Sequence, residues 1–562
     1  MAITEARPEA LPSGEEEHGI APQRHPIWEW LTTTDHKKIG IMYLVNSYFW
    51  FGVAGLLAEF MRTELAKPGQ QFFEPNQFNE LFTMHGTTMI FLFIIPILAG
   101  FANYIVPLQI GALDMAFPRV NALSFWLLPL GGIILYSGYF TGGTACAGWT
   151  EYPPLSEQSC GAGGGVGADL WILGLLLVGT SSILGAVNFI TTIFNMRAPG
   201  MTMFRLPLFV WTVLVTSLLV LLATPVFTAA LVLLLIDRNL GGSFFDPTKG
   251  GIAIMWQNIF WFYSHPAVYV MVLPGMGIVS EILPVFSRKP LFGYKAFVFA
   301  TAGIGALGFS VWAHHMFATG TVLLPFFSLM TFFIAVPTGV KFFNWISTMW
   351  RGKLRFDTPM LFAVGFLAMF LIGGVDGVFL ASPPVDFALH DTYWVIAHIH
   401  YVLFGGSVFA VYAGFYYWFP KFTGKRLNEG LGKLHFWLQL IGFNLTFFPM
   451  HVLGLLGMPR RISDYLAFKD WTGLNLLETV GAYIIAVSTA PFLANVWLTL
   501  RRKTRDEENP WDANTLEWYT TSPPPPHNFD SLPEIHSERP LFDLRHADQL
   551  AVHAEATTTG AT

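Results

Sequence analysis

The chain has 562 residues, of which 53% are apolar and only 12% are charged, about half the charged share of roughly 25% found in soluble domains. This composition predicts a membrane protein surrounded by lipid. The formal net charge of −6 argues against a nucleic-acid partner, because phosphate recognition needs a concentrated basic surface. Two cysteines are too few for a disulfide scaffold, a thiolate cluster or a structural zinc site. Any metal is therefore expected to be held mostly by nitrogen or oxygen.

Residues 1–38 contain no long apolar run, and we expect a cytoplasmic N-terminal segment rather than a secretory signal peptide. Residues 39–500 should form the catalytic core. This core contains twelve apolar runs, each long enough to cross a membrane as a helix, which takes about 20 residues. The runs lie near 39–61, 81–106, 122–142, 169–194, 206–236, 252–283, 293–313, 322–349, 360–381, 392–418, 434–457 and 474–500. The sequence therefore predicts an all-α membrane protein with a twelve-helix bundle.

The distribution of basic residues predicts the orientation in the membrane. Most of the 31 lysines and arginines lie in the terminal segments or in connections that follow even-numbered spans. Because cytoplasmic loops carry the excess of positive charge, both termini are expected in the cytoplasm, with the protein in a bacterial cytoplasmic membrane. Residues 501–562 lack an apolar run and contain SPPPPHNFDSLPEI, so we expect an extended, partly polyproline-type cytoplasmic tail.

The predicted outer loop 143–168 contains both cysteines and the glycine-rich run GAGGGVG. The run follows no strand, so we interpret it as a flexible loop and not as a phosphate-binding loop. Whether Cys146 and Cys160 form a disulfide stays open, because spacing alone does not decide it.

Histidines carry the strongest functional signal in the spans. Ionisable groups in hydrocarbon are costly and mark functional sites. With both termini inside, the histidines in question all fall at the outer end or in the outer half of their spans, so they should share one layer of the membrane. We single out six of the sixteen histidines, which lie inside apolar runs or at their rims, namely His85, His265, His314, His315, His398 and His400.

Helical spacing relates several of these groups to one another. On the tenth span, His398 and His400 project about 200° apart at about 100° per residue, which suits two separate flat cofactors. On the sixth span, Tyr269 follows His265 by four residues, so the phenol and the imidazole share a helical face.

The sixth and seventh spans together offer three neutral imidazoles. The adjacent His314 and His315, with His265, form a nitrogen donor set that suits copper and also zinc or iron. His85 on the second span is then left to pair with one of the tenth-span histidines as an axial haem ligand.

Longer motifs resemble one family, the haem–copper terminal oxidases, and within it subunit I of cytochrome c oxidase. The resemblance runs from TTDHKKIG near residue 33 to SPPPPHNF near residue 529. The motifs include, in order, RTELAKPG, VPLQIGALDMAFPRVNALSFWLLP, GWTEYPPL, SSILGAVNFITT, VWAHHMF, HDTYWVIAHIHYV and TFFPMHVLGLLGMPRR. So many ordered matches identify the chain as a member of this family.

The resemblance implies two haems, expected to be haem A, and a copper ion called copper B. The implied ligands are His85 and His400 for the low-spin haem, His398 for the high-spin haem, and His265, His314 and His315 for copper B. In this family Tyr269 is covalently joined to His265 and supplies an electron and a proton when the O–O bond breaks. Four-electron reduction of O2 needs such a redox-active group beside two metals.

Further matches lie at the outer ends of the spans. Arg460 and Arg461 resemble a pair that binds haem propionates, for which guanidinium groups are well suited. Arg62 matches an arginine that hydrogen-bonds the formyl group of the low-spin haem. His390 and Asp391 match a magnesium site whose further ligand comes from subunit II.

Protons from the cytoplasm must cross the inner half of the spans to reach the metal layer. The resemblance implies two routes through polar residues. The K-type channel would use Thr338, Lys341, Ser280 and Tyr269, and the D-type channel would begin at Asp114, with Asn103 and Asn121 nearby.

One position departs from the commonest family pattern. Most members have a glutamate two residues after the sixth-span histidine, whereas this chain has Ala267. The preceding pair, Tyr263 and Ser264, resembles an A-type branch in which Tyr–Ser occupies the space of the missing carboxyl. Tyr263 precedes Ala267 by four residues and projects to a similar face. We therefore expect proton pumping to depend on a different shuttle.

Together these patterns predict the catalytic subunit of a respiratory oxidase that reduces O2 to water and translocates protons. Electrons should come from cytochrome c through the dinuclear copper A site of a separate subunit II, and subunit III and small subunits should complete the complex. A quinol-fed oxidase would share the core, whereas a nitric oxide reductase should lack the Lys341 channel and the Tyr269 arrangement. A secondary transporter, the rival from a different class, should have repeated halves, which the sequence does not show.

Overall fold

A computed structural model describes residues 26–157, 165–467 and 470–547 of the chain. The chain divides into two compact units, Met1–Thr33 and Thr34–Thr562. Helix α1 (Pro26–Leu31) is the described helix of the first unit. All the predicted site residues belong to the second unit. Cys160 lies outside the described residues, so the question of a disulfide with Cys146 stays open.

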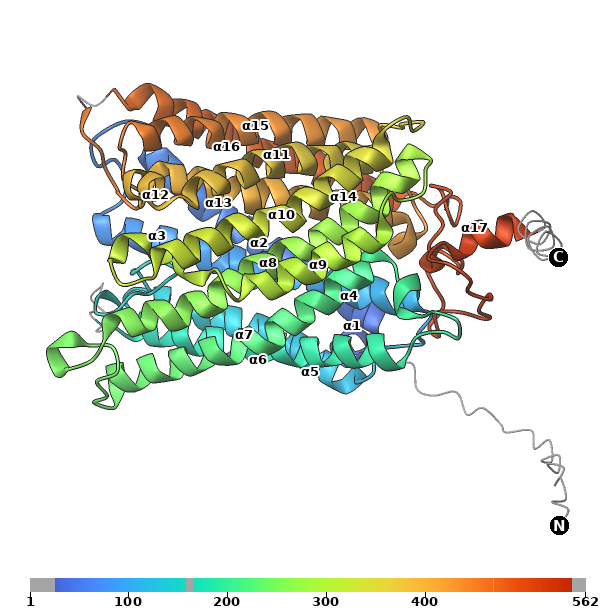
Figure 1. The fold of residues 1–562 in the computed structure, drawn as a ribbon, viewed down its shortest axis with the longest axis horizontal. Coiled ribbons are helices and arrows are strands. Elements are labelled where there is room, and N and C mark those ends of the chain that lie inside the picture. Colours follow the sequence, from blue (N-terminus) through green and yellow to red (C-terminus); the bar gives the residue numbers. More distant parts are fainter. Residues whose placement is uncertain (1–25, 158–164, 468–469, 548–562) are drawn as a thin grey trace, which may run out of the picture. The chain divides into compact units, whose positions relative to one another are not determined.

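Twelve helical segments of the second unit are long and apolar enough to cross a membrane, counted over the described residues. They lie side by side as a bundle (Figure 1), which confirms the predicted fold. The second span begins at Pro75, six residues before the predicted start. Hydropathy did not indicate this start, because the first turn of the helix is polar. The spans are α2 (His36–Glu64), α3 (Pro75–Thr88) with η1 (Met89–Ile94) and α4 (Ile95–Ile110), α5 (Pro118–Ser137) with η2 (Gly138–Phe140), α6 (Val166–Asn195), α7 (Leu208–Asn239), α8 (Ala253–Ser287), α9 (Tyr294–Gly308) with η6 (Trp312–Thr319), α10 (Leu324–Met349), α11 (Thr358–Leu380), α13 (Tyr393–Val402) with η7 (Leu403–Val408) and α14 (Phe409–Thr423), α15 (Glu429–Leu455) and α16 (Thr472–Arg501).

Short helices connect the spans or lie in the C-terminal segment. They are η3 (Leu155–Glu157), η4 (Met203–Arg205), η5 (Pro247–Lys249), α12 (Pro383–Leu389), η9 (Leu516–Trp518) and α17 (Pro540–Arg545). The described part of the C-terminal segment is mainly irregular. It nevertheless buries Trp511, Leu516 and Trp518, and Trp511 Nε1 donates a 2.8 Å hydrogen bond to the Tyr417 carbonyl at the end of the tenth span. Aromatic side chains therefore fasten this segment to the bundle.

Two spans contain π-helical segments directly after predicted haem ligands. In the second span, η1 begins four residues after His85, and in the tenth, η7 begins three residues after His400. The Ile95 N–H bonds to the Ile90 carbonyl, five residues back, so each turn here holds more backbone than an α-helical turn. Such segments are rare and occur often at functional sites.

The seventh span is also irregular where function was predicted. Helix α9 ends at Gly308, and the 3₁₀ segment η6 carries His314 and His315. The predicted run ended near residue 313, within this transition. Because η6 is not an α-helix, α-helical angles do not describe how its two adjacent imidazoles project.

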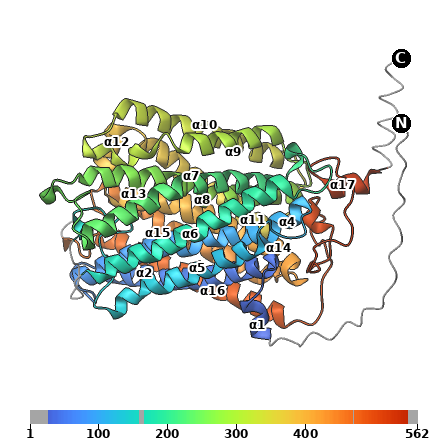
Figure 2. The same cartoon turned by 90° about the horizontal axis from the view of Figure 1, so that it is seen from below.

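Packing places the candidate site inside the bundle. The second span and α8 are buried over most of their length, whereas α10 is mostly exposed and lies at one edge (Figure 2). Helix α11 packs against α13 and α14, and α13 packs against α15. The outward side of α10 presents Phe333 and Phe343, as expected for a helix in contact with lipid.

Candidate functional site

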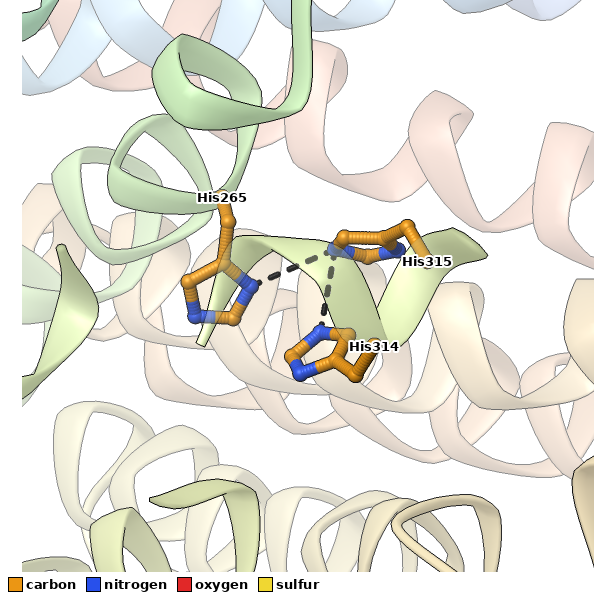
Figure 3. Close-up of side chains that lie close together, drawn as sticks. All are labelled: His265, His314 and His315. Carbon is orange, nitrogen blue, oxygen red and sulfur yellow. Dashed lines mark hydrogen bonds between the residues drawn. The ribbon is translucent and has the colours of Figure 1, made fainter. Parts of the chain in front are cut away.

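Three imidazoles converge between α8 and η6 (Figure 3). His265 Nδ1 lies 3.2 Å from His315 Nε2, and His314 Nε2 lies 3.1 Å from the same atom. One ligand nitrogen from each residue lies within 4.8 Å of the others. His314 Nδ1 lies 3.0 Å from Thr331 Oγ1, and a proton on Nδ1 leaves the Nε2 lone pair free. The predicted three-nitrogen donor set is thus assembled, and it fits a copper ion.

Tyr269 lies beside this cluster on α8. Its ring centroid is 4.9 Å from that of His265, in agreement with the predicted shared face. His265 Nε2 is buried and has no hydrogen-bond partner among the described residues. His265 therefore offers Nδ1 to the cluster and holds a second, unsatisfied nitrogen next to a phenol.

His85 on α3 and His400 on α13 face each other. Their ring centroids are 6.3 Å apart, with ring planes 17° from parallel. His85 Nδ1 lies 2.9 Å from the Ala54 carbonyl and His400 Nδ1 lies 2.8 Å from the Ile396 carbonyl. Each Nδ1 must donate to its carbonyl, so each Nε2 keeps its lone pair for a metal. The two Nε2 atoms would hold one haem iron between these helices.

His398 faces a different helix. Its Nδ1 lies 3.1 Å from the Gly373 carbonyl and 3.5 Å from Asp376 Oδ2, both on α11. The same tautomer argument leaves Nε2 free to ligate a metal. His398 and His400 therefore project to separate neighbours, as their spacing predicts.

Comparison with known proteins decides the family. Residues 38–484 match the family model described as Cytochrome C and Quinol oxidase polypeptide I. This chain belongs to that family. It is 53% identical over 538 residues to a protein of Corynebacterium efficiens named cytochrome c oxidase subunit 1, with 95% of this chain and 92% of the relative covered. A protein of Corynebacterium diphtheriae with the same name is 55% identical over 522 residues, covering 92% of each chain.

A solved structure supports the fold of this oxidase family member. The structure is titled "Cryo-EM structure of a heme-copper terminal oxidase dimer provides insights into its catalytic mechanism" and matches with a TM-score of 0.68. The match covers 84% of this chain and 85% of the other at 20% sequence identity. At that identity the likeness concerns the fold alone.

The connection after α15 carries two arginines that differ in their contacts. Arg460 Nε donates a 2.6 Å hydrogen bond to Asp391 Oδ1. Arg461 has no ion-pair partner among the described residues and lies over the Phe82 ring at 5.8 Å. Burial, and next Arg460, lower the pKa of Arg461 to about 10. A half-buried guanidinium without an ion-pair partner among the described residues fits an anionic group such as a haem propionate.

His390 and Asp391 lie together after α12. His390 Nε2 is 3.8 Å from Asp391 Oδ2, and His390 Nδ1 is 3.1 Å from Asp386 Oδ2. The hydrogen bond to Asp386 raises the pKa of His390. Burial opposes ionisation of Asp391, but Arg460 and His390 outweigh it and lower the pKa of this carboxyl. Asp391 Oδ2 is the oxygen available to bind a cation, because Oδ1 accepts hydrogen bonds from Arg460. The partner of His390, Asp386, was not predicted from the sequence.

Arg62 is held by the last span. Its Nη1 lies 3.1 Å from Glu478 Oε2, and its Nη2 donates to the backbone carbonyl and side-chain oxygen of Asn475 at 2.9 and 3.0 Å. Arg62 Nε is buried with no partner among the described residues. That N–H is the donor available to a further acceptor. Sequence reasoning missed Glu478, although an acidic residue in an apolar run is itself a signal.

Two of the predicted K-type residues, Lys341 and Ser280, contact Met276. Lys341 is buried, with Nζ 3.6 Å from Met276 Sδ. Ser280 Oγ donates to the Met276 carbonyl at 2.7 Å and accepts from Trp345 Nε1 at 3.0 Å. Thr338 Oγ1 donates to the Ile334 carbonyl, 3.2 Å away on its own helix. The structure thus brings Lys341 and Ser280 to one methionine, without a direct hydrogen bond among the predicted channel residues.

One of the predicted D-type residues, Asn103, lines a mainly apolar cavity. Burial raises the pKa of Asp114, in the connection after α4, to about 6. A cavity of about 70 Å³ extends from Asn103 along α4, α5, α6, α7 and α8, with Ser181, Ser182 and Thr216 on its wall. Asn103 Oδ1 and Asn121 Nδ2 are buried without partners among the described residues. Polar groups left in this state are suited to bind water.

Tyr263 and Ser264 lie on α8 without a hydrogen bond between them in the described contacts. The Tyr263 ring stacks on Phe227 with centroids 4.5 Å apart. Ser264 Oγ is buried and has no partner among the described residues. Ala267 is buried as well, so the departure from the family pattern lies in the protein interior.

Two histidines within the predicted eleventh span, His435 and His451, were missed by the sequence interpretation. His451 Nε2 lies 3.1 Å from Asp376 Oδ2, and Asp376 in turn faces the predicted ligand His398. His435 Nδ1 lies 3.2 Å from the Tyr416 hydroxyl. The sequence does carry a signal for the His451 contact, because Asp376 is an acidic residue within the apolar run of the ninth span.

Proposed function

We propose that this chain is the catalytic subunit of a respiratory terminal oxidase with cytochrome-c oxidase activity. It reduces O2 to water with electrons from cytochrome c and couples this reaction to proton translocation. The observation that carries the proposal is the convergence of three imidazole nitrogens beside Tyr269, in a chain of the oxidase family. A quinol-fed oxidase is the alternative, and the donor assay below separates the two.

The family implies haems and copper B, and the donor geometry fits them. When bound, these groups bind O2 and transfer electrons to it. His85 and His400 would hold the low-spin haem, and His398 the high-spin haem, each through Nε2. The cluster of His265, His314 and His315 would hold copper B. Haem A is the proposed haem type.

Tyr269 is proposed to supply an electron and a proton when the O–O bond breaks. The unsatisfied His265 Nε2 beside it supports a covalent link between the two side chains. Such a link would fix the phenol next to the reacting oxygen, so that its proton and electron travel a short distance.

Charged groups at the outer ends of the spans are proposed to position the cofactors. Arg460 and Arg461 would hold haem propionates, and Arg62 would donate Nε–H to a formyl group. His390 and Asp391 would bind Mg²⁺ where subunit II docks. The separation of 3.8 Å between their facing atoms supports a shared ligand.

Two inner routes are proposed for protons. Lys341, Thr338, Ser280 and Tyr269 would form a K-type channel, in which the Lys341 ammonium moves between water-bound positions. Asp114 would admit protons to the D-type cavity.

Asn103, which lines that cavity, and the buried Asn121 would hold water. Tyr263 and Ser264 would then take the place of a carboxyl shuttle near the metals.

The remaining assignments concern the surroundings of the catalytic core. We propose a bacterial cytoplasmic membrane with both termini in the cytoplasm. Residues 1–38 would be a cytoplasmic segment, 39–500 the catalytic core and 501–562 a cytoplasmic tail. Subunit II with a copper A centre would deliver electrons, and subunit III and small subunits would complete the complex.

A reduced-minus-oxidised spectrum of the purified complex, with pyridine extraction of its haems, tests this proposal. Two haems per chain, one of which binds CO, are expected. Oxygen consumption should be supported by reduced cytochrome c, whereas activity with a quinol alone would identify the alternative. A preparation with protein-bound haem that consumes no O2 with either donor would refute the oxidase assignment.

A further inference from the structure

Asp376 is a buried acidic residue inside the apolar helix α11. Its relative exposure is 4%, and the surrounding sequence, IGGVDGVFL, contains no other ionisable side chain. A carboxylate in such a place is costly unless hydrogen-bond donors surround it. The neighbours of Asp376 therefore decide its state.

Three nitrogen atoms from two other helices face this carboxyl group. Trp394 Nε1 on α13 donates to Oδ1 in a short hydrogen bond. His451 Nε2 on α15 lies 3.1 Å from Oδ2, and His398 Nδ1 lies 3.5 Å from the same oxygen. The indole N–H can only donate. His451 Nδ1 also lies 3.2 Å from the Phe448 carbonyl of its own helix, and a neutral imidazole has one N–H, so His451 does not fix the state of the carboxyl group. The donors that bear on Asp376 are therefore the Trp394 indole and the Nδ1–H of His398.

The imidazole of His398 is fixed against the same helix. Its Nδ1–H is shared between the Gly373 carbonyl at 3.1 Å and Asp376 Oδ2 at 3.5 Å. Gly377 also lies against the ring, since a Cβ built there would be only 2.9 Å from His398 Cε1. The ring is therefore oriented by α11, and its Nδ1–H faces a neutral and a negatively charged acceptor at once.

We propose that Asp376 is a positioning residue that makes His398 a more basic and more electron-donating metal ligand, and that Trp394 moderates this effect. The inference rests on the proposed ligand role of His398. A carboxylate that accepts the second N–H of a ligating histidine raises the basicity of that ligand. A more electron-donating ligand stabilises the oxidised iron and lowers its reduction potential.

The contacts of the network assign different signs to its members. Asp376 increases the negative charge felt by His398. The Trp394 N–H takes up part of that charge through Oδ1. Removal of the carboxylate charge and removal of the Trp394 donor should therefore shift the properties of His398 in opposite directions. A residue that only filled space would produce no such opposition.

The test uses the purified holoenzyme and the variants Asp376→Asn and Trp394→Phe. The iron–imidazole stretching band of the reduced high-spin haem is recorded by resonance Raman spectroscopy, and the haem potentials are measured by redox titration. Asp376→Asn should lower the band frequency and raise the high-spin haem potential. Trp394→Phe keeps an aromatic ring but loses the N–H, so it should raise the frequency and lower the potential.

A matched control removes another buried carboxylate. Asp237, near the end of α7, is 3% exposed and accepts hydrogen bonds from the Phe244 and Phe245 N–H groups of the following connection at 2.9 and 2.7 Å. Asp237→Asn should leave the band and both potentials unchanged. Unchanged bands in Asp376→Asn and Trp394→Phe, or shifts of the same sign, would overturn the proposal. If Asp376→Asn assembles without haem, Trp394→Phe alone decides. In that case, failure of Trp394→Phe to raise the band frequency would refute the proposal.

His398→Ala separates this inference from the function on which it rests. Loss of the iron–imidazole band in that variant supports the ligand role, so that an unchanged Asp376→Asn would refute the present inference alone. Persistence of the band would instead overturn the ligand assignment itself.

Discussion

Gly377→Ala offers a steric test of the candidate haem ligand His398. The added Cβ would lie 2.9 Å from His398 Cε1, while ordinary contact begins near 3.4 Å. The imidazole must therefore move by about half an ångström, because α11 itself is packed against α13, α14 and α15. Overpacking of this kind costs about 1–3 kcal/mol. If the strain falls on the metal–ligand geometry, the affinity for the high-spin haem should drop about 5- to 140-fold.

Gly374→Ala provides a control on the same helix. Nothing lies within 4 Å of a Cβ at Gly374, and both substitutions gain about 1 kcal/mol in helix propensity. The comparison therefore isolates the contact with His398.

The assay combines haem content by pyridine extraction with the CO difference spectrum of the high-spin haem. Gly377→Ala should lose CO-binding haem and keep the low-spin signal, because His400 faces away from α11, whereas Gly374→Ala should resemble wild type. A full CO signal and an unchanged iron–imidazole band in Gly377→Ala would refute the reasoning.

Four further predictions concern the other proposed residues. His85→Ala should abolish the low-spin haem spectrum while copper remains measurable by metal analysis, and an undiminished spectrum would contradict the axial assignment. Lys341→Met should slow reduction of the high-spin haem by about 10²-fold in stopped-flow spectra without slowing that of the low-spin haem; equal rates would make Lys341 structural. Tyr263→Phe should slow proton ejection from reconstituted vesicles, with Ala267→Glu as a candidate rescue, and wild-type ejection would eliminate the tyrosine relay. Burial raises the pKa of Asp114 to about 6, so folding stability should fall as pH rises from about 4 through about 6; Asp114→Asn should remove this part of the pH dependence in unfolding measurements, and an identical profile would contradict it.

The architecture was predictable because hydrophobic length is a local property of the sequence. A run such as 360–381 must cross the bilayer whatever its neighbours are, and α11 indeed spans Thr358–Leu380. The juxtaposition of His265 and Tyr269 was predictable for a similar reason, since both belong to one regular helix. Polar first turns hid the true start of the second span.

Relations between spans were harder to predict. The contact of Asp376 with His451 joins residues 75 positions apart, and no periodicity within either span indicates it. The need for glycine at position 377 follows only from its tertiary contact with the His398 ring. The convergence of His314 with His315 depends on the 3₁₀ segment η6, where α-helical angles fail. Such features follow from tertiary packing, which composition and hydropathy do not encode.

The π-helical segments η1 and η7 limit how these spans can change in length during evolution. Loss of one residue within Leu403–Val408 could restore regular α-helix, but it would turn everything beyond that point by about 100°. Either the histidines on α13 would keep their partners and α14 would present a different side to α11, or α14 would keep its packing and the histidines would turn away from their partners. A one-residue deletion that a surface loop would tolerate would here change the packing of α14 relative to that of α13. Length variation among relatives is therefore expected in the connections, with these two wide turns kept at constant length.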